Sequence, residues 1–327
     1  MMYRTRKSFD RLLIRVKSSG EYFFLKMCKH LFRLPRMINN MVEFEKKYLI
    51  LSIDAERDIY TYRTLIAGWQ VGVPTILDIL SENDLDKKVC WLIQFDDRDG
   101  LAFSNPSCSR YVANHEELVG EIKRKGHEFG LHPTVYAYAG NRWDYRRPLE
   151  DSRFVSNLVH RGTQALLSVC KEQPVGCRTG NCHFALSLSK ALEIEGYLID
   201  SSATRRFWEP IHAPNAWFAE EKDYRSERAS GSKTRVLEIP TTDRITASRR
   251  GLFSLEFNPN LLGWHSTSRV LFLSAYFHNW DAITESGKTN PRFKEALQCF
   301  ISSLSDHEVK VVSFSEAYRI YHSLKKF

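Results

Sequence analysis

The sequence YLILSIDAERD at residues 48–58 passes directly from a short apolar run into a cluster of charged side chains. Further short apolar runs follow along the chain, and segments with helical patterning separate most of them. This alternation is typical of βα units that build a parallel sheet. We therefore predict strands at residues 48–53, 89–95, 127–132, 174–178, 197–202, 236–240, 270–278 and 309–314.

The segments between these strands carry the start and stop signals of α-helices. The Asn290-Pro291 pair is typical of a helix start, and Gly196 of a position just beyond a helix end. The expected helices cover residues 75–83, 114–125, 152–171, 184–195, 291–305 and 315–325.

About seven βα repeats within 280 residues predict one α/β domain, an incomplete or distorted (β/α)7 TIM-like barrel over residues 48–327. The stretch 203–269 interrupts the repeats, because Pro, Trp, Asn and Gly accumulate there. We predict that this stretch is a long insertion with irregular strands that could cover a site.

The positive charge of the protein is concentrated at its N-terminus. The 327 residues have a formal net charge of +8, and residues 1–47 account for all of it, with twelve Lys and Arg against four Asp and Glu. The remaining 280 residues are neutral overall, which argues against a nucleic-acid-binding body with a basic face.

Residues 1–47 also place apolar side chains at helical spacing among their basic residues. We therefore predict an N-terminal helical extension ahead of the barrel. A basic amphipathic pattern is typical of a segment that docks on an anionic membrane surface, or on a partner that presents one. The alternative is a helical extension packed against the main domain with its charges solvated.

The expected compartment is the cytoplasm. The seven cysteines are scattered and include no CxxC pair, which fits a reducing environment. Charges interrupt the apolar runs near the N-terminus that a secretory signal would need, and no run approaches the roughly 20 apolar residues of a membrane span. We expect a cytoplasmic protein that is at most peripheral at the inner face of the membrane.

Polar residues that could carry chemistry follow four of the predicted strands. In a βα barrel the reactive groups sit at the C-terminal ends of the strands. Asp54 and Glu56 follow the first strand, and alternate strand residues share a face, so we expect both carboxylates at one strand mouth. The alternative is a pair of solvated loop acids.

Two histidines lie five positions apart in the stretch GHEFGLHP at residues 126–133. Residues five apart face opposite sides of a strand, so only one of them can look into the barrel mouth. His132 is the better candidate because it stands at the C-terminal end. We interpret His127 as a structural histidine that a nearby backbone group satisfies.

An arginine and two more histidines mark the remaining strand ends. Arg178 could bind a carboxylate or brace a catalytic acid, and His183 lies near the start of the following helix. His278 stands where an apolar strand stops and is a candidate general acid.

In this order, the segments resemble the motifs of the polysaccharide deacetylase family, which comprises carbohydrate esterase family 4 and its relatives. Members of this family are incomplete βα barrels and metal-dependent amide or ester hydrolases. The resemblance covers about residues 48–325. It rests on LSIDAERD (51–58), GHEFGLHP (126–133), GCRTG (176–180) with GYLIDSS (196–202), LEIP (237–240) and FHNWD (277–281).

The resemblance implies a role for each matching residue. Asp54 would be the catalytic base, Arg178 the residue that orients this base, and His278 the general acid. Glu56 and His132 would be ligands of a divalent metal, by resemblance Zn²⁺.

The sequence departs from the family at Tyr136, where the second motif usually has another histidine four residues after the first. The Asp-His-His metal site of the family is therefore incomplete. We favour His183, from the next strand end, as the third metal ligand. The alternatives are that water or Asp54 completes a weaker site, or that metal binding and catalysis have been lost.

The function that the resemblance implies is hydrolysis of an N-acetyl group of a carbohydrate in bacterial surface polysaccharide synthesis. Trp280, together with Trp208 and Trp217, could form a stacking platform for the sugar, or these side chains could simply pack in the core or at its rim. The alternative function is a catalytically inactive deacetylase-like barrel that acts as a carbohydrate-binding or scaffold protein. Hydrolysis of a non-sugar amide or imide is a third reading.

Overall fold

The structure is a computed structural model of the whole chain. Every described residue belongs to one compact unit of the chain. The first 44 residues and most of the predicted insertion at 203–269 lie outside the described residues. The described residues are 45–56, 67–95, 115–135, 137–139, 142–144, 151–180, 185–202, 235–239, 241, 243–245, 270–306 and 308–324.

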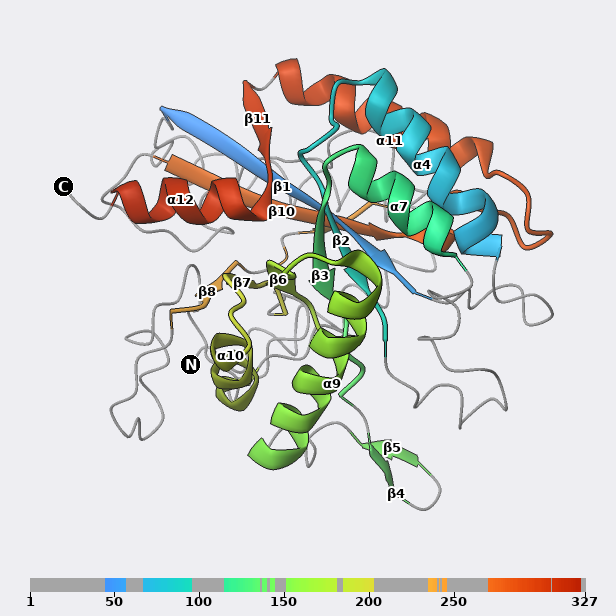
Figure 1. Cartoon of the computed structure of the whole chain (residues 1–327). Helices are drawn as coiled ribbons and strands as arrows, with labels where there is room; N and C mark the ends of the chain where they lie inside the picture. The colour runs from blue at the N-terminus through green and yellow to red at the C-terminus, as the bar shows by residue number, and fades with distance from the viewer. Residues whose placement is uncertain are drawn as a thin grey trace, which may run out of the picture. The chain divides into compact units, whose positions relative to one another are not determined.

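A parallel sheet curls into a half-barrel with helices around it, which confirms the predicted distorted α/β barrel (Figure 1). The strand order is β8-β7-β6-β3-β2-β1-β10-β9, and β11 pairs with β1 beside this path. The strands are β1 (Lys46–Ala55), β2 (Cys90–Ile93), β3 (Glu128–Leu131), β6 (Gly176–Cys177), β7 (Ile199–Asp200), β8 (Leu237–Glu238), β9 (Asp243–Arg244), β10 (Val270–His278) and β11 (Val309–Val312).

All eight predicted strands are confirmed, because each predicted range contains or lies within one of these strands. The two-residue strand β9 was not predicted. Neither was the separate antiparallel pair of β4 (Ala137–Ala139) and β5 (Arg142–Asp144).

The long strand β1 is the centre of the sheet. Along one edge it pairs with β10, from Lys46 opposite Val270 to Asp54 opposite His278. Its other edge is shared by β11 and β2. Because these pairings are parallel, the C-terminal ends of the strands lie at one end of the half-barrel.

Helices cover the outside of the sheet (Figure 1). The predicted helix ends agree with the structure to within two residues. The helices are α4 (Val73–Glu82), α7 (Glu116–Arg124), α9 (Ser152–Cys170), α10 (Leu186–Ile194), α11 (Pro291–Asp306) and α12 (Phe314–Leu324).

Two acidic side chains satisfy backbone groups at helix starts. Asp151 accepts hydrogen bonds from the backbone N–H groups of Arg153 and Phe154, so α9 begins there. Glu128, the first residue of β3, accepts a hydrogen bond from the backbone N–H of Ser315 in the first turn of α12. This second hydrogen bond connects the start of β3 to the start of α12.

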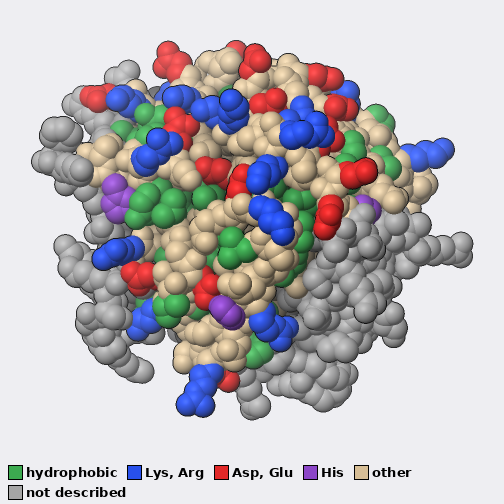
Figure 2. All heavy atoms as spheres, in the orientation of Figure 1, with side chains coloured by type: hydrophobic (Ala, Val, Ile, Leu, Met, Phe, Trp, Pro, Cys, Tyr) green, Lys and Arg blue, Asp and Glu red, His purple; other side chains and the backbone are tan. Residues whose placement is uncertain are grey.

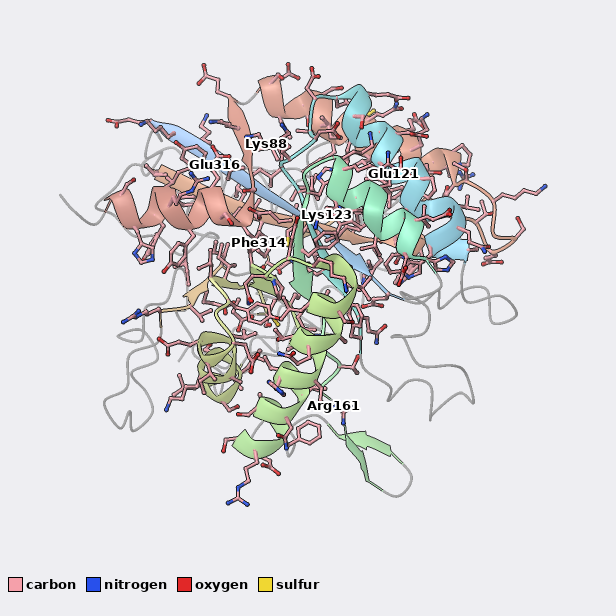
Figure 3. All side chains as sticks on the ribbon, viewed as in Figure 1. Lys88, Glu121, Lys123, Arg161, Phe314 and Glu316 are labelled. Carbon is pink, nitrogen blue, oxygen red and sulfur yellow. The ribbon has the colours of Figure 1, made fainter. Side chains whose placement is uncertain are left out.

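One apolar cluster in the core packs strands of the sheet against helix α12. Phe314, at the start of α12 (Figure 3), packs into this cluster. A Cβ atom on Gly176 of β6 would lie 2.1 Å from the Phe314 ring, so this position has room only for glycine. The cluster consists of Ile50, Cys90, Leu92, Ile199, Leu237, Ile239, Phe272, Val312, Phe314 and Ala317.

The surface in Figure 2 carries charges of both signs. Lys and Arg side chains lie among Asp and Glu side chains over the described part of this face. Lys88 Nζ pairs with Glu316 Oε2 at 3.1 Å, and both residues are labelled in Figure 3. This mixture agrees with the neutral charge of the chain after residue 47. Within the described residues, no helix is both long and apolar enough to cross a membrane.

His127 lies directly before β3 and is 2% exposed. The interpretation that a backbone group satisfies it is wrong for the described structure, because neither ring nitrogen has a hydrogen-bond partner. The nearest carboxylate oxygen is Asp86 Oδ1, at 3.8 Å from Nε2. Burial lowers the pKa of His127 to about 4, although the Asp86 carboxylate partly opposes this shift.

The depressed pKa of His127 predicts a loss of stability in mild acid. As the pH falls from about 6.5 towards 4, the unfolded chain binds a proton on this imidazole that the folded protein excludes. Between pH 7.5 and 5 we expect this residue to lower the free energy of unfolding by about 2 kcal/mol. His127→Phe should remove that part of the pH dependence in urea unfolding. The control His160→Phe, at an exposed histidine of α9, should keep it, and an equal loss in all three proteins would contradict the prediction.

Candidate active site

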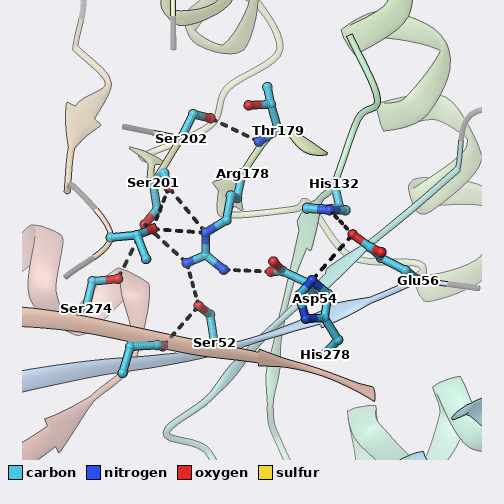
Figure 4. A network of polar contacts seen from close by, with 12 residues as sticks. Ser52, Asp54, Glu56, His132, Arg178, Thr179, Ser201, Ser202, Ser274 and His278 are labelled. Carbon is cyan, nitrogen blue, oxygen red and sulfur yellow. Dashed lines mark hydrogen bonds and ion pairs between the residues drawn. The ribbon is translucent and has the colours of Figure 1, made fainter. Parts of the chain in front are cut away.

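Five of the predicted site residues meet at the C-terminal end of the half-barrel (Figure 4). Asp54 lies in β1 and Glu56 is the first residue after this strand, whereas His278 is the last residue of β10. His132 directly follows β3, and Arg178 directly follows β6. The sheet therefore brings together side chains from four strand ends that are far apart in the sequence.

The Asp54 carboxylate forms a buried ion pair with the Arg178 guanidinium. Arg178 Nη1 donates to Asp54 Oδ1 at 2.6 Å, and the two side chains are 0% and 2% exposed. Nη2 donates to Ser52 Oγ at 2.7 Å, and Nε donates to the backbone oxygen of Ser201 at 3.2 Å. The guanidinium carbon also lies 4.5 Å from the centre of the Tyr276 ring, a cation–π distance. These contacts fix the guanidinium, and the guanidinium fixes one oxygen of Asp54.

The contacts of Arg178 extend into a network of buried polar side chains around it (Figure 4). Ser201 Oγ donates to the backbone oxygen of Ile239 at 2.8 Å and lies 3.4 Å from Ser274 Oγ. Thr241 Oγ1 donates to the backbone oxygen of Ser201 at 3.0 Å. Buried polar groups require such partners, so the network stabilises the charged end of the barrel interior.

Glu56 lies between two histidines. Its Oε1 atom is 2.5 Å from His132 Nε2 and 3.8 Å from His278 Nε2. Burial would raise the pKa of Glu56, but the nearby His278 and His132 lower it to about 2. Burial would lower the pKa of His132, but the carboxylates of Asp54 and Glu56 raise it to about 9. At neutral pH, Glu56 and His132 therefore form a charged hydrogen bond.

The His278 ring is oriented by the turn that follows it. Asp281 Oδ2 accepts a hydrogen bond from the backbone N–H of His278 at 2.9 Å and lies 3.3 Å from Nδ1. The Trp280 ring stacks on the imidazole, with 4.2 Å between ring centres and an angle of 18°. Asp281 was not predicted as a site residue, although its position three residues after His278 places it within reach in a turn.

The predicted sugar platform is only partly within the described residues. Trp280 is 3% exposed and its ring packs against His278, so the geometry favours packing for this residue over stacking against a sugar. Trp208 and Trp217 lie outside the described residues, as do His183 and Tyr136.

The donor atoms of Glu56 and His132 suit a divalent metal, because carboxylate oxygen and imidazole nitrogen are common ligands of Zn²⁺ and similar ions. Among the described residues, however, no three His, Cys, Asp or Glu side chains are grouped to hold a metal ion. A histidine ligand must also be neutral, so an ion would have to displace the proton that His132 carries. The described residues thus supply two suitable ligands rather than a complete site.

The fold and these residues define an α/β half-barrel protein with acidic, basic and imidazole groups at the C-terminal ends of its strands. No protein-family model matches the sequence, and neither does any curated protein. A proposed polysaccharide deacetylase from Mycobacterium smegmatis has a similar structure, with a TM-score of 0.51 and 18% identity over 87% of this chain and 94% of that chain.

Two further solved structures are similar to this chain at lower TM-scores. A family 4 carbohydrate esterase from Streptomyces lividans in complex with acetate has a TM-score of 0.41 and 12% identity over 81% of this chain and 91% of that chain. A family 4 pseudoenzyme from Bacillus anthracis has a TM-score of 0.43 and 14% identity over 84% of this chain and 66% of that chain. The Mycobacterium smegmatis structure shows that this chain has the polysaccharide deacetylase fold, which confirms the predicted resemblance at the level of the fold.

Proposed function

We propose that this protein is a hydrolase that removes an acetyl group from the nitrogen of a carbohydrate. The observation that carries this proposal is the buried Asp54–Arg178 ion pair beside Glu56, His132 and His278 at the C-terminal end of the half-barrel. The deacetylase fold supports the same reaction class. An O-acetyl ester is the less favoured substrate.

Asp54 is the proposed general base. Arg178 binds its Oδ1 atom, so Oδ2 would accept the proton of the attacking water. The ion pair with Arg178 limits the rotation of the Asp54 carboxylate. A fixed carboxylate favours a base that acts on a water molecule in a fixed position.

His278 is the proposed general acid. It stands opposite Asp54 in the register of β1 and β10. With Nδ1 directed to Asp281, the Nε2 atom would protonate the departing amine nitrogen of the sugar. In the same cleavage of the amide bond, Asp54 would thus act on the attacking water and His278 on the departing amine.

Glu56 and His132 are the proposed protein ligands of a divalent metal, with His183 as the proposed third. Such an ion would supply Lewis-acid polarisation of the acetyl carbonyl. The chain contributes the orientation of the two described ligands, whose donor atoms lie 2.5 Å apart.

Acetate release tests the proposal directly. The full-length protein should release acetate from N-acetylated mono- or oligosaccharides when Zn²⁺ or Co²⁺ is added. Absence of both acetate release and stoichiometric metal would contradict the hydrolase and favour the alternative, an inactive barrel that binds carbohydrate. The absence of a third metal ligand among the described residues is the observation that keeps this alternative open.

We further propose a role in the synthesis of a bacterial surface polysaccharide, in the cytoplasm, on a precursor at an anionic membrane. The support is the charge of +8 on residues 1–47 of an otherwise neutral chain. Each basic residue near an anionic surface contributes about 1 kcal/mol to binding. Co-sedimentation with phosphatidylserine vesicles should therefore be lost when the basic residues before residue 44 are replaced by Gln, and unchanged binding would contradict the membrane role.

A further inference from the structure

Asn279, the first residue beyond strand β10, makes two hydrogen bonds to the backbone of Glu56. Its Oδ1 atom accepts from the Glu56 N–H at 3.0 Å, and its Nδ2 atom donates to the Glu56 carbonyl at 2.9 Å. Asn279 is 0% exposed. Both polar atoms of the Asn279 side chain therefore bind the backbone of one residue of the candidate site.

These bonds replace backbone pairing where the ladder between β1 and β10 ends. The last pair of the ladder is Asp54 opposite His278. Beyond it the chain turns into the short helix η6 (Asn279–Ala282), so β10 offers Glu56 no further backbone partner. A carboxamide has the same donor and acceptor as a peptide group, which lets Asn279 extend the ladder past the end of the strand.

A second element packs directly against Asn279. The π-helical segment η1 (Gly68–Gly72) approaches so closely that a Cβ atom on Gly72 would lie 2.2 Å from the Asn279 backbone oxygen. The π-helix is rare and occurs often at functional sites. Asn279 is thus confined between η1 and Glu56.

We propose that Asn279 is a positioning residue, which sets the Glu56 carboxylate against His132 and His278. The Glu56 carboxylate lies between the two histidines, and Asn279 holds the Glu56 backbone on both its N–H and its C=O. The consequence for metal binding rests on the proposed function. The consequence for the Glu56–His132 ion pair does not.

A thermodynamic cycle tests the effect on the ion pair. Asn279→Ala and Glu56→Gln should each lower the Tm of the full chain, and the double variant should lose less than the two single losses combined, by about 2 °C or more. Once the Glu56 side chain no longer carries the charge that pairs with His132, a less firmly held Glu56 backbone should lower the Tm little further. A merely structural Asn279 would give additive losses, and additivity would overturn the proposal.

Asn290→Ala is the matched control for this cycle. The Asn290 amide also bonds two backbone groups, the Asp281 carbonyl and the Phe293 N–H, but it makes no bond to Glu56. Its Tm loss should therefore be additive with that of Glu56→Gln.

Metal affinity provides a second measurement. In titration calorimetry with Zn²⁺ alone, Asn279→Ala should weaken binding about 10- to 100-fold, as outer partners of metal ligands typically do, whereas Asn290→Ala should not. Equal affinity in wild type and Asn279→Ala would overturn the positioning role at the metal. If the wild type binds no Zn²⁺, the proposed metal site fails, and the cycle still decides whether Asn279 positions Glu56.

Discussion

The Arg178→Met variant should lose about 3–5 kcal/mol of its free energy of unfolding, because it leaves the Asp54 carboxylate buried without a counter-charge. Asp54 is 1% exposed, so bulk water solvates the carboxylate too little to replace the guanidinium. The same change removes the donors that Ser52 and Ser201 accept from. Urea unfolding at neutral pH measures the loss.

A second substitution separates the ion pair from general damage to the core. Asp54→Asn removes the stranded charge, so Arg178→Met should cost clearly less in the Asp54→Asn background than in the wild type. Arg161→Met, at an exposed position of α9 labelled in Figure 3, should change stability by no more than about 0.5 kcal/mol. Equal costs of Arg178→Met in both backgrounds would show that the pair with Asp54 is not what stabilises this region.

Asp54→Asn and His278→Gln should each lower kcat/KM for acetate release from an N-acetylated sugar by about 10²- to 10⁴-fold. Asp54→Asn removes the atom proposed to accept the proton of the attacking water. His278→Gln removes the proposed donor to the departing amine. The kinetic assay is run beside a thermal melt, so that loss of activity is separated from loss of folded protein.

The leaving group distinguishes the two roles. An aryl acetate releases a phenolate that departs without being protonated, so His278→Gln should keep much more of its activity on this substrate than on the amide. Asp54→Asn should be slow on both, since water attacks in each case. Asp78→Asn and His160→Gln change exposed residues of α4 and α9 and should match the wild type. The same loss for both site variants on both substrates would contradict the assignment of acid and base.

The sequence predicted the elements of the fold closely because their signals are local. Short apolar runs marked each of the eight strands, and helical spacing marked the helices between them. The unpredicted pieces have no such signal. Strand β9 pairs over only two residues, Asp243 and Arg244, and Gly72 of the π-helical segment η1 packs against Asn279, which is distant in the sequence.

The candidate site was predicted in part. Strand ends and alternation placed Asp54, Glu56, His132, Arg178 and His278 at one end of the half-barrel, and the structure brings them together there. The sequence did not reveal that Asn279 holds the Glu56 backbone. Nor did it decide between packing and sugar stacking for Trp280, because a large aromatic residue after a strand can serve either role.

The sequence by itself determined which residues share a strand face and at which end of the strands the polar residues lie. The reason is that side chains alternate along a strand and that polar residues follow the apolar runs. Only the tertiary structure decided which of these groups touch. Arg178 meets Asp54 across 124 positions of sequence and His132 meets Glu56 across 76, distances that no local pattern spans and that the curl of the parallel sheet closes.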